Sequence, residues 1–231
     1  MKKILFLALC LITLSPLCLM AETIPANDSR VVFVGRTAVD GTSVSFDWTA
    51  TYFRIAFSGQ SLTMKASETK WDATPEMAAT RHNYYNVWID SPTSAEPHRI
   101  IEVAGNDTVI ELVDPLYLKR SRRSVHEVIV QKRTEGEQGK TTIHEFTTNG
   151  KFFQAETLKE RQLEFIGDSY TCGYGIDAPS RKDRFTPETE NASRSYAGIV
   201  SRYFGADYVA IAHSGMGIAR NYNSKFKNWW M

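Results

Sequence analysis

The sequence predicts a β-sandwich followed by an α/β domain, and three observations carry this prediction. Short β-prone runs separated by turn residues fill the stretch from Val31 to about Phe153. Near residue 155 the pattern changes, and the charged run AETLKERQ leads into the apolar run LEFIG. A segment with helical spacing and a second apolar run follow, which is the order of a strand, a helix and a strand. We therefore expect a sandwich over residues 30–155 and an α/β domain over residues 160–231.

The first residues are typical of a secretory signal peptide. Lys2 and Lys3 precede an apolar stretch from Ile4 to Leu14, and the small residue Ala21 follows. That stretch is shorter than the roughly 20 apolar residues that a membrane span needs. We expect residues 1–21 to be removed and the protein to be secreted or periplasmic, without a membrane partner.

Composition narrows the class of function further. The chain of 231 residues has 27 basic and 26 acidic side chains, a balance that does not favour a nucleic-acid partner. Of its three cysteines, Cys10 and Cys18 lie in the predicted signal peptide, so Cys172 has no partner for an internal disulfide. We expect the Cys172 thiol to be a buried packing group, because no cationic neighbour is visible that would activate it.

Eight runs predict the strands of the sandwich, and we expect this domain to be all β. Alternation places Arg54 and Glu111 opposite their apolar neighbours, which predicts a solvent-facing side for their strands. The stretches GNDT at 105–108 and EGEQGK at 135–140 predict hairpin connections, and the basic run at 119–123 predicts a solvated turn. The eight runs are VVFVG, SVSFDW, TYFRIAFSG, SLTMKA, YYNVWID, RIIEVAG, TVIELV and VHEVIVQK.

The second domain is expected to begin with a strand, a helix and a strand. Apolar residues recur at helical spacing between Ser195 and Phe204, and Gly205 follows where a C-terminal cap belongs. Asn191 or Ser193 is the expected N-terminal cap. The run DYVAIA at 207–212 predicts a buried strand, parallel to the LEFIG strand and most simply beside it.

Two glycine-containing loops follow these two strands. Ser169 lies in EFIGDSYTCGYG after the first strand, and Gly215 lies in HSGMG after the second. In an open parallel sheet, ligands bind beyond the carboxyl ends of the strands. Acyl transfer needs a nucleophilic oxygen, a base and N–H donors for the oxyanion. We therefore predict Ser169 as the nucleophile and the Gly215 N–H as an oxyanion donor, with Gly217 as the alternative donor.

The loop from 170 to 193 is far longer than the usual 2–6 residues of a strand–helix connection, which predicts a binding surface. Tyr170, Tyr174 and Phe185 have flat rings that suit the apolar faces of sugars, although such rings can also simply hold a loop in place. We take Tyr170, Tyr174 and Asn221 as candidate substrate-binding residues.

These stretches resemble a known family. EFIGDSYTCGYG resembles block I of the SGNH (GDSL-type) esterases, and AIAHSGMGIARNY resembles their second block. With a preceding sandwich, the order resembles carbohydrate esterase family 2, secreted bacterial deacetylases with an N-terminal jelly roll and a C-terminal SGNH hydrolase domain of flavodoxin-like, three-layer form. The resemblance implies an O-acetyl esterase acting on acetylated plant polysaccharides or oligosaccharides of the xylan or mannan type, without metal or cofactor. It also implies that the Ser169 and Gly215 N–H groups hold the oxyanion and that Asp168 is structural.

The sequence departs from this family after the second block. The family uses a histidine base from a D-x-x-H-like block and an asparagine from a third block, and neither block follows here. His213 is the one histidine in this segment, and we expect it to be a packing residue rather than the base. We therefore expect an SGNH domain that is truncated at its C-terminus and a serine that, in this chain alone, is not activated.

Two other functions stay open. One is a carbohydrate-binding protein with a vestigial hydrolase segment, whose stacking platform would come from Trp48, Trp71, Tyr84, Tyr85 and Trp88. The other is a GDSL-type lipase or thioesterase. No group of His, Cys, Asp or Glu has the sequence spacing of metal ligands, so no metal site is predicted.

Overall fold

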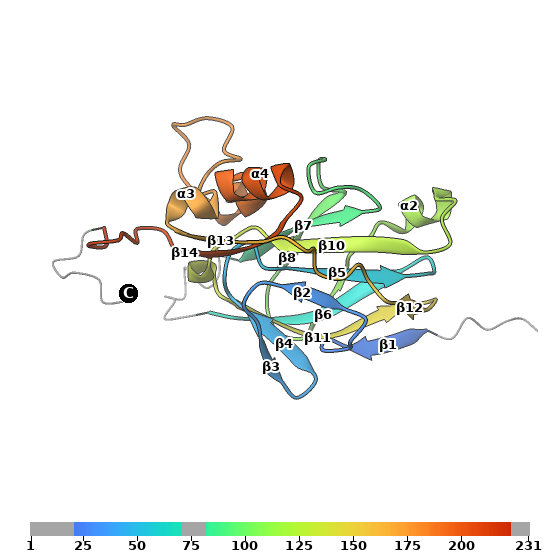
Figure 1. Cartoon of the computed structure of the whole chain (residues 1–231). Helices are drawn as coiled ribbons and strands as arrows, with labels where there is room; N and C mark the ends of the chain where they lie inside the picture. Colours follow the sequence, from blue (N-terminus) through green and yellow to red (C-terminus); the bar gives the residue numbers. More distant parts are fainter. Residues whose placement is uncertain (1–20, 71–81, 223–231) are drawn as a thin grey trace, which may run out of the picture.

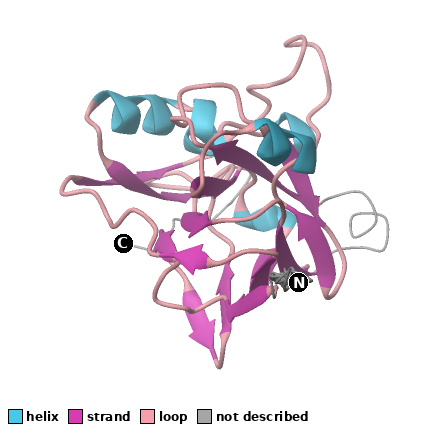
Figure 2. Ribbon diagram, turned by 90° about the vertical axis from the view of Figure 1, so that its right-hand side faces the viewer, coloured by secondary structure: helices cyan, strands magenta, loops and turns pink. Residues whose placement is uncertain are grey.

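The computed structural model describes residues 21–70 and 82–222, which form two antiparallel sheets and a smaller parallel pair of strands with helices (Figure 1). The two antiparallel sheets, residues 22–153, are called the sandwich below. The parallel pair with its helices, residues 162–222, is called the α/β segment. Figure 2 shows most of the helices gathered at the top of the molecule, with most of the strands below them.

Each sheet of the sandwich has six strands. The first has the order β3 (Ala38–Asp40), β4 (Ser43–Phe46), β11 (Lys140–Thr148), β6 (Leu62–Thr69) and β9 (Thr108–Glu111), with β1 (Glu22–Pro25) also paired to β11. The second has the order β12 (Phe152–Phe153), β5 (Tyr52–Phe57), β10 (His126–Lys132), β7 (Asn83–Ile89) and β8 (Arg99–Val103), with β2 (Val32–Val34) also paired to β5.

The core of the sandwich lies between the inner faces of these sheets. On β6 the side chains of Leu62, Met64 and Ala66 are fully buried, while the residues between them are partly exposed. This is the period of two that a strand with one solvated face requires. Phe53 of the second sheet meets Phe146 of the first with ring centroids 5.1 Å apart, so the two sheets share one apolar core.

All eight predicted strand runs contain a strand, but the prediction of an all-β domain with hairpins was wrong in three places. The stretch 105–108 leads from β8 to β9 and the stretch 135–140 leads from β10 to β11, so each connects the two sheets. The basic run at 119–123 begins in the last turn of a helix, α2 (Pro115–Arg120), whose first turn is capped by the Asp114 side chain. Strands β1, β3, β11 and β12 were not among the predicted runs.

Arg54 is buried rather than solvent-facing, because the α/β segment covers the outer face of β5. Only 2% of its surface is exposed, and its guanidinium donates to both carboxylate oxygens of Asp207 at the start of β14. Glu111, on the edge strand β9, does face solvent as predicted.

The α/β segment contains the predicted strand, helix and strand. Strands β13 (Gln162–Gly167) and β14 (Asp207–Ala212) are parallel neighbours, with Gly167 beside Ala212. The connection holds α3 (Ser169–Cys172), the 3-10 turns η2 (Pro187–Thr189) and η3 (Ala192–Arg194), and α4 (Tyr196–Tyr203). In Figure 1, α3 and α4 lie on one side of this pair and the sandwich lies on the other. No helix in the described ranges has the length and apolar character to cross a membrane.

Both ends of α4 differ slightly from expectation. Its N-cap is Ser195, and the predicted cap Asn191 precedes η3 instead, while Ser193 lies inside that turn. At the other end the cap is Phe204, and Gly205 follows it with a φ of 59°, the left-handed conformation that favours glycine.

Asp207 ties the α/β segment to the sandwich. Burial alone would raise the pKa of its carboxyl, but hydrogen bonds from Arg54, from the Tyr52 hydroxyl and from the Lys159 N–H outweigh that effect and hold the pKa below its ordinary value. Since the carboxylate is fully buried, its charge depends on these partners.

We expect Arg54→Met to destabilise the protein by about 3–5 kcal/mol, because Asp207 would keep a buried charge without its cation. Urea unfolding followed by tryptophan fluorescence measures this loss. The matched control is Arg36→Met. Its 3.3 Å ion pair with Glu164 also joins the two parts, but both side chains are more than half exposed, so we expect a loss below about 1 kcal/mol. Equal losses in the two variants would contradict the role given to Asp207.

Candidate active site

Ser169 is the first residue of α3, directly beyond the carboxyl end of β13. Asp168 is the N-cap, and its carboxylate accepts the Tyr170 N–H at 3.1 Å, so its role here is structural. Gly167 permits the sharp turn into the helix, because a Cβ at this position would collide with the Thr171 side chain. The Gly-Asp-Ser order therefore has a local physical reason.

Gly215 lies in the turn that follows β14. Its φ of 77° is in the left-handed region, so a larger residue would be strained there. The His213 N–H donates to the Gly167 carbonyl at 3.3 Å, so the two loops leave the sheet side by side. The structure thus brings Ser169 and Gly215 to the same edge of the parallel pair.

The N–H groups of Ser169 and Gly215 have no acceptor among the described residues, whereas the N–H group of Tyr170 donates to Asp168. The Ser214 N–H donates to Glu135, and the Met216 N–H donates to the His213 carbonyl. N–H groups that keep such donor capacity at the edge of a sheet are suited to stabilise an oxyanion.

The alternative donor and the substrate-binding candidates have different surroundings. Gly217 already donates its N–H to Asn221 Oδ1 at 3.4 Å. The Asn221 side chain therefore helps to hold the turn that follows β14. Tyr174 stacks on Phe185, with ring centroids 3.7 Å apart, and these rings hold the long loop as well as offering a surface. Tyr170, beside Ser169, is 81% exposed and offers a free ring.

No described histidine forms a hydrogen bond with the Ser169 hydroxyl. His213 Nδ1 lies 2.8 Å from the Ser214 carbonyl oxygen and therefore donates to it. His82, His98, His126 and His144 all lie in the sandwich. No histidine in the described ranges therefore makes the contact with Ser169 that is expected of a base.

Arg133, just after β10, holds the long loop against the sandwich. Its guanidinium is almost fully buried and donates to Asn86 Oδ1, Asp177 Oδ2 and the carbonyl oxygens of Glu188 and Glu190, at 2.7 to 3.1 Å. A planar fork with fixed donors suits such a set of acceptors.

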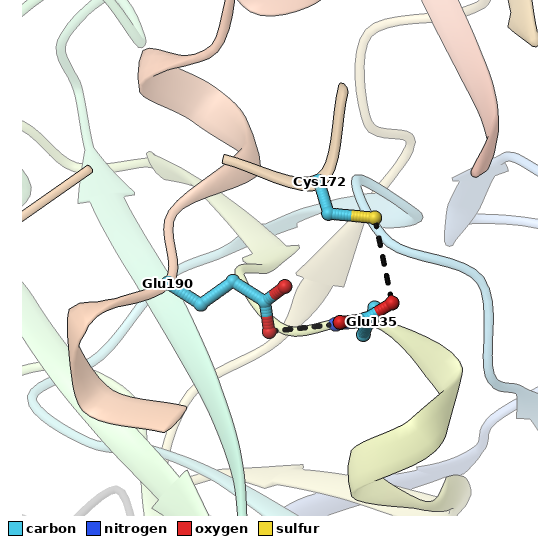
Figure 3. A group of neighbouring side chains, drawn as sticks. All are labelled: Glu135, Cys172 and Glu190. Carbon is cyan, nitrogen blue, oxygen red and sulfur yellow. Dashed lines mark hydrogen bonds between the residues drawn. The ribbon is translucent and has the colours of Figure 1, made fainter. Parts of the chain in front are cut away.

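Figure 3 shows a cluster of buried polar side chains that sequence spacing did not predict. Glu135, Cys172 and Glu190 come from three separate segments, and one ligand atom from each lies within 4.8 Å of the others. Such a donor set can hold a cation in geometric terms. The buried Lys132 ammonium already supplies positive charge, donating to the carbonyl oxygens of Thr134 and Glu135.

The charges in this cluster influence one another. Burial, together with the charge of Glu135, raises the pKa of the Glu190 carboxyl well above its ordinary value. Burial lowers the pKa of Lys132 to about 8 and raises the pKa of the Cys172 thiol. Burial in this cluster thus favours the neutral forms of the Glu190 carboxyl and the Cys172 thiol. Cys172 is therefore the buried, unreactive thiol that the sequence predicted.

The structure thus places Ser169 and Gly215 just beyond the ends of two adjacent parallel strands. The model of the family described as "Carbohydrate esterase 2 N-terminal" matches residues 33–155, more than half of the chain. The chain therefore belongs to carbohydrate esterase family 2.

The chain is similar to an acetylxylan esterase/glucomannan deacetylase of Cellvibrio japonicus, with 31% identity over 215 residues that cover 87% of this chain and 51% of the relative. A solved family two carbohydrate esterase from Clostridium thermocellum, in complex with cellohexaose, is 27% identical with a TM-score of 0.72, over 85% of this chain and 55% of that one. A family two carbohydrate esterase from Cellvibrio japonicus shares the fold, with a TM-score of 0.73 at 23% identity, over 87% and 55% of the two chains. The chain thus spans about half the length of these relatives.

Glu190→Gln should change how stability depends on pH. Because the folded pKa of Glu190 is raised, its favourable contribution is present below its unfolded pKa of about 4.3 and is lost as pH rises. Glutamine resembles the protonated acid and does not titrate. We therefore expect the melting temperature of the variant minus that of the wild type to increase steadily from about pH 5 to pH 8. Glu188→Gln, an exposed change in the same loop, is the control and should show no such trend. A difference in melting temperature that does not change with pH would contradict a raised pKa for Glu190.

Proposed function

We propose that this chain carries the nucleophile and oxyanion donors of a secreted or periplasmic carbohydrate O-acetyl esterase. This proposal rests on Ser169 and on two N–H groups that have no acceptor in residues 21–70 and 82–222. They lie at the carboxyl edge of a parallel pair, in a member of carbohydrate esterase family 2. In this proposal the sandwich is a jelly-roll domain over 30–155, and residues 160–231 belong to a flavodoxin-like SGNH domain. Residues 1–21 form a signal peptide, and all but Ala21 lie outside the described residues.

The proposed reaction begins with attack of Ser169 Oγ on the acetyl carbonyl carbon. The carbonyl oxygen becomes an oxyanion, which the N–H groups of Ser169 and Gly215 stabilise. The sugar oxygen leaves and takes up a proton, so the acetyl group is held on Ser169 as an ester. Water then releases acetate and restores the serine. The base that accepts the Ser169 proton is not among the described residues.

The proposed substrates are acetylated polysaccharides or oligosaccharides of the xylan or mannan type. The Cellvibrio relative is named an acetylxylan esterase/glucomannan deacetylase, and the Clostridium structure holds cellohexaose. In this chain the exposed ring of Tyr170 lies next to Ser169 and offers a flat apolar surface for a sugar ring.

The structure gives less support to a sugar-binding platform on the sandwich. Tyr85 and Trp88 are each only 1% exposed, so their rings are not available for stacking on a ligand. Trp71 lies outside the described residues. We therefore prefer the esterase to a binding protein.

Ser169→Ala in the full-length gene product should lower acetate release from acetylated xylan by at least about 1,000-fold, because the acyl acceptor is removed. Acetate is measured enzymatically at saturating substrate. Ser180→Ala, an exposed serine in the same loop, is the control and should keep full activity. Persistence of acetate release in Ser169→Ala would refute the assignment of the nucleophile.

A further inference from the structure

One carboxylate oxygen of the sandwich contacts both loops of the candidate site. Glu135 is fully buried, and its Oε2 accepts the Ser214 N–H at 2.6 Å. The same oxygen accepts the Cys172 thiol at 3.7 Å (Figure 3). Ser214 directly precedes Gly215, and Cys172 lies in α3, the short helix that begins at Ser169. The carboxylate thus connects the serine helix to the glycine turn.

We propose that Glu135 is a positioning residue, which holds the Gly215 N–H in place relative to Ser169 from outside the α/β segment. The effect of Glu135 on catalysis rests on the proposed esterase function. The contact itself is a property of the fold and can be tested without activity.

The strength of this contact follows from charge and burial. A hydrogen bond from an N–H to a carboxylate is roughly twice as strong as one between neutral groups, and burial keeps water from competing for it. Oxyanion donors have to be held within about 0.5 Å of their productive position. The turn at 213–217 contains two glycines and is therefore conformationally free on its own. An outside anchor on the residue before Gly215 supplies the missing restraint.

Glu135 is itself held firmly. Its N–H donates to Glu190 Oε2 at 3.1 Å, and its carbonyl oxygen accepts the Lys132 ammonium at 2.9 Å. Arg133, two residues earlier, is fixed by its own buried hydrogen bonds to the long loop. The backbone from which the Glu135 side chain extends therefore has little freedom to move.

A purely structural role would appear as a loss of stability alone. A positioning role also lowers kcat while KM changes little, because substrate binding is kept and transition-state stabilisation is lost. Glu137, exposed and two residues further along, provides a control of the same charge on the same turn.

The experiment compares Glu135→Ala, Glu135→Gln and Glu137→Gln in the full-length gene product. Acetate release gives kcat and KM, and hydrogen exchange followed by NMR gives the protection of the Ser214 amide. We expect Glu135→Ala to lower kcat about 100-fold with KM within about twofold, and to reduce Ser214 protection at least about tenfold. Glu135→Gln keeps an acceptor for the Ser214 N–H and should recover part of both losses. Glu137→Gln should match the wild type.

The outcomes separate this inference from the proposed function. Unchanged kcat, or unchanged Ser214 protection, in folded Glu135→Ala overturns the positioning role. If Glu135→Ala does not fold, the kcat and the Ser214 amide protection of Glu135→Gln are compared with those of the wild type instead. Wild-type values of either quantity would then overturn the positioning role. If the wild type releases no more acetate than Ser169→Ala, the esterase function fails. Ser214 exchange then still decides whether Glu135 holds the turn.

Discussion

The buried guanidinium of Arg133 is the constraint on which the arrangement of the α/β segment depends. It fixes Asp177 and two carbonyl groups of the long loop to the end of β10. Asp177 in turn accepts hydrogen bonds from Asn191 and Arg194, close to the start of α4. A loop of this length would otherwise lose much conformational entropy on ordering. One sandwich side chain therefore helps to fix the path of the long loop before α4 begins.

The sandwich accordingly acts as a support for chemistry that lies outside it. Its second sheet is buried on both faces where the α/β segment covers it. An apolar cluster that includes Tyr52, Ala197 and Tyr208 lies at that contact, and polar pairs add to it. Arg54 binds Asp207 at the start of β14, and Glu135 binds the turn after the end of the same strand. Strand β14 is thus held from the sandwich near both of its ends. This explains physically why a chain would join these two folds.

Local patterns predicted much of the fold and the candidate site. β-Prone runs bounded by turn residues predicted eight strands, and the two loops after the predicted parallel strands predicted that Ser169 and Gly215 lie at one sheet edge. What the sequence did not predict depends on contacts between distant residues. Arg54 alternates like a solvent-facing residue, and only the packing of the α/β segment buries it. Glu135 lies 79 residues before Ser214, in a stretch whose composition is typical of a simple turn.

Hydrogen exchange of the wild-type protein tests most directly whether the sandwich holds the site. The decisive amides are those of Asp177, Glu190 and Asn191 in the long loop, each of which donates to a backbone carbonyl. If Arg133 and its partners hold this loop to the sandwich, these amides exchange nearly as slowly as those of strand β10. Exchange as fast as in an unrestrained surface loop would show that the loop opens independently of the sandwich, and would contradict the account.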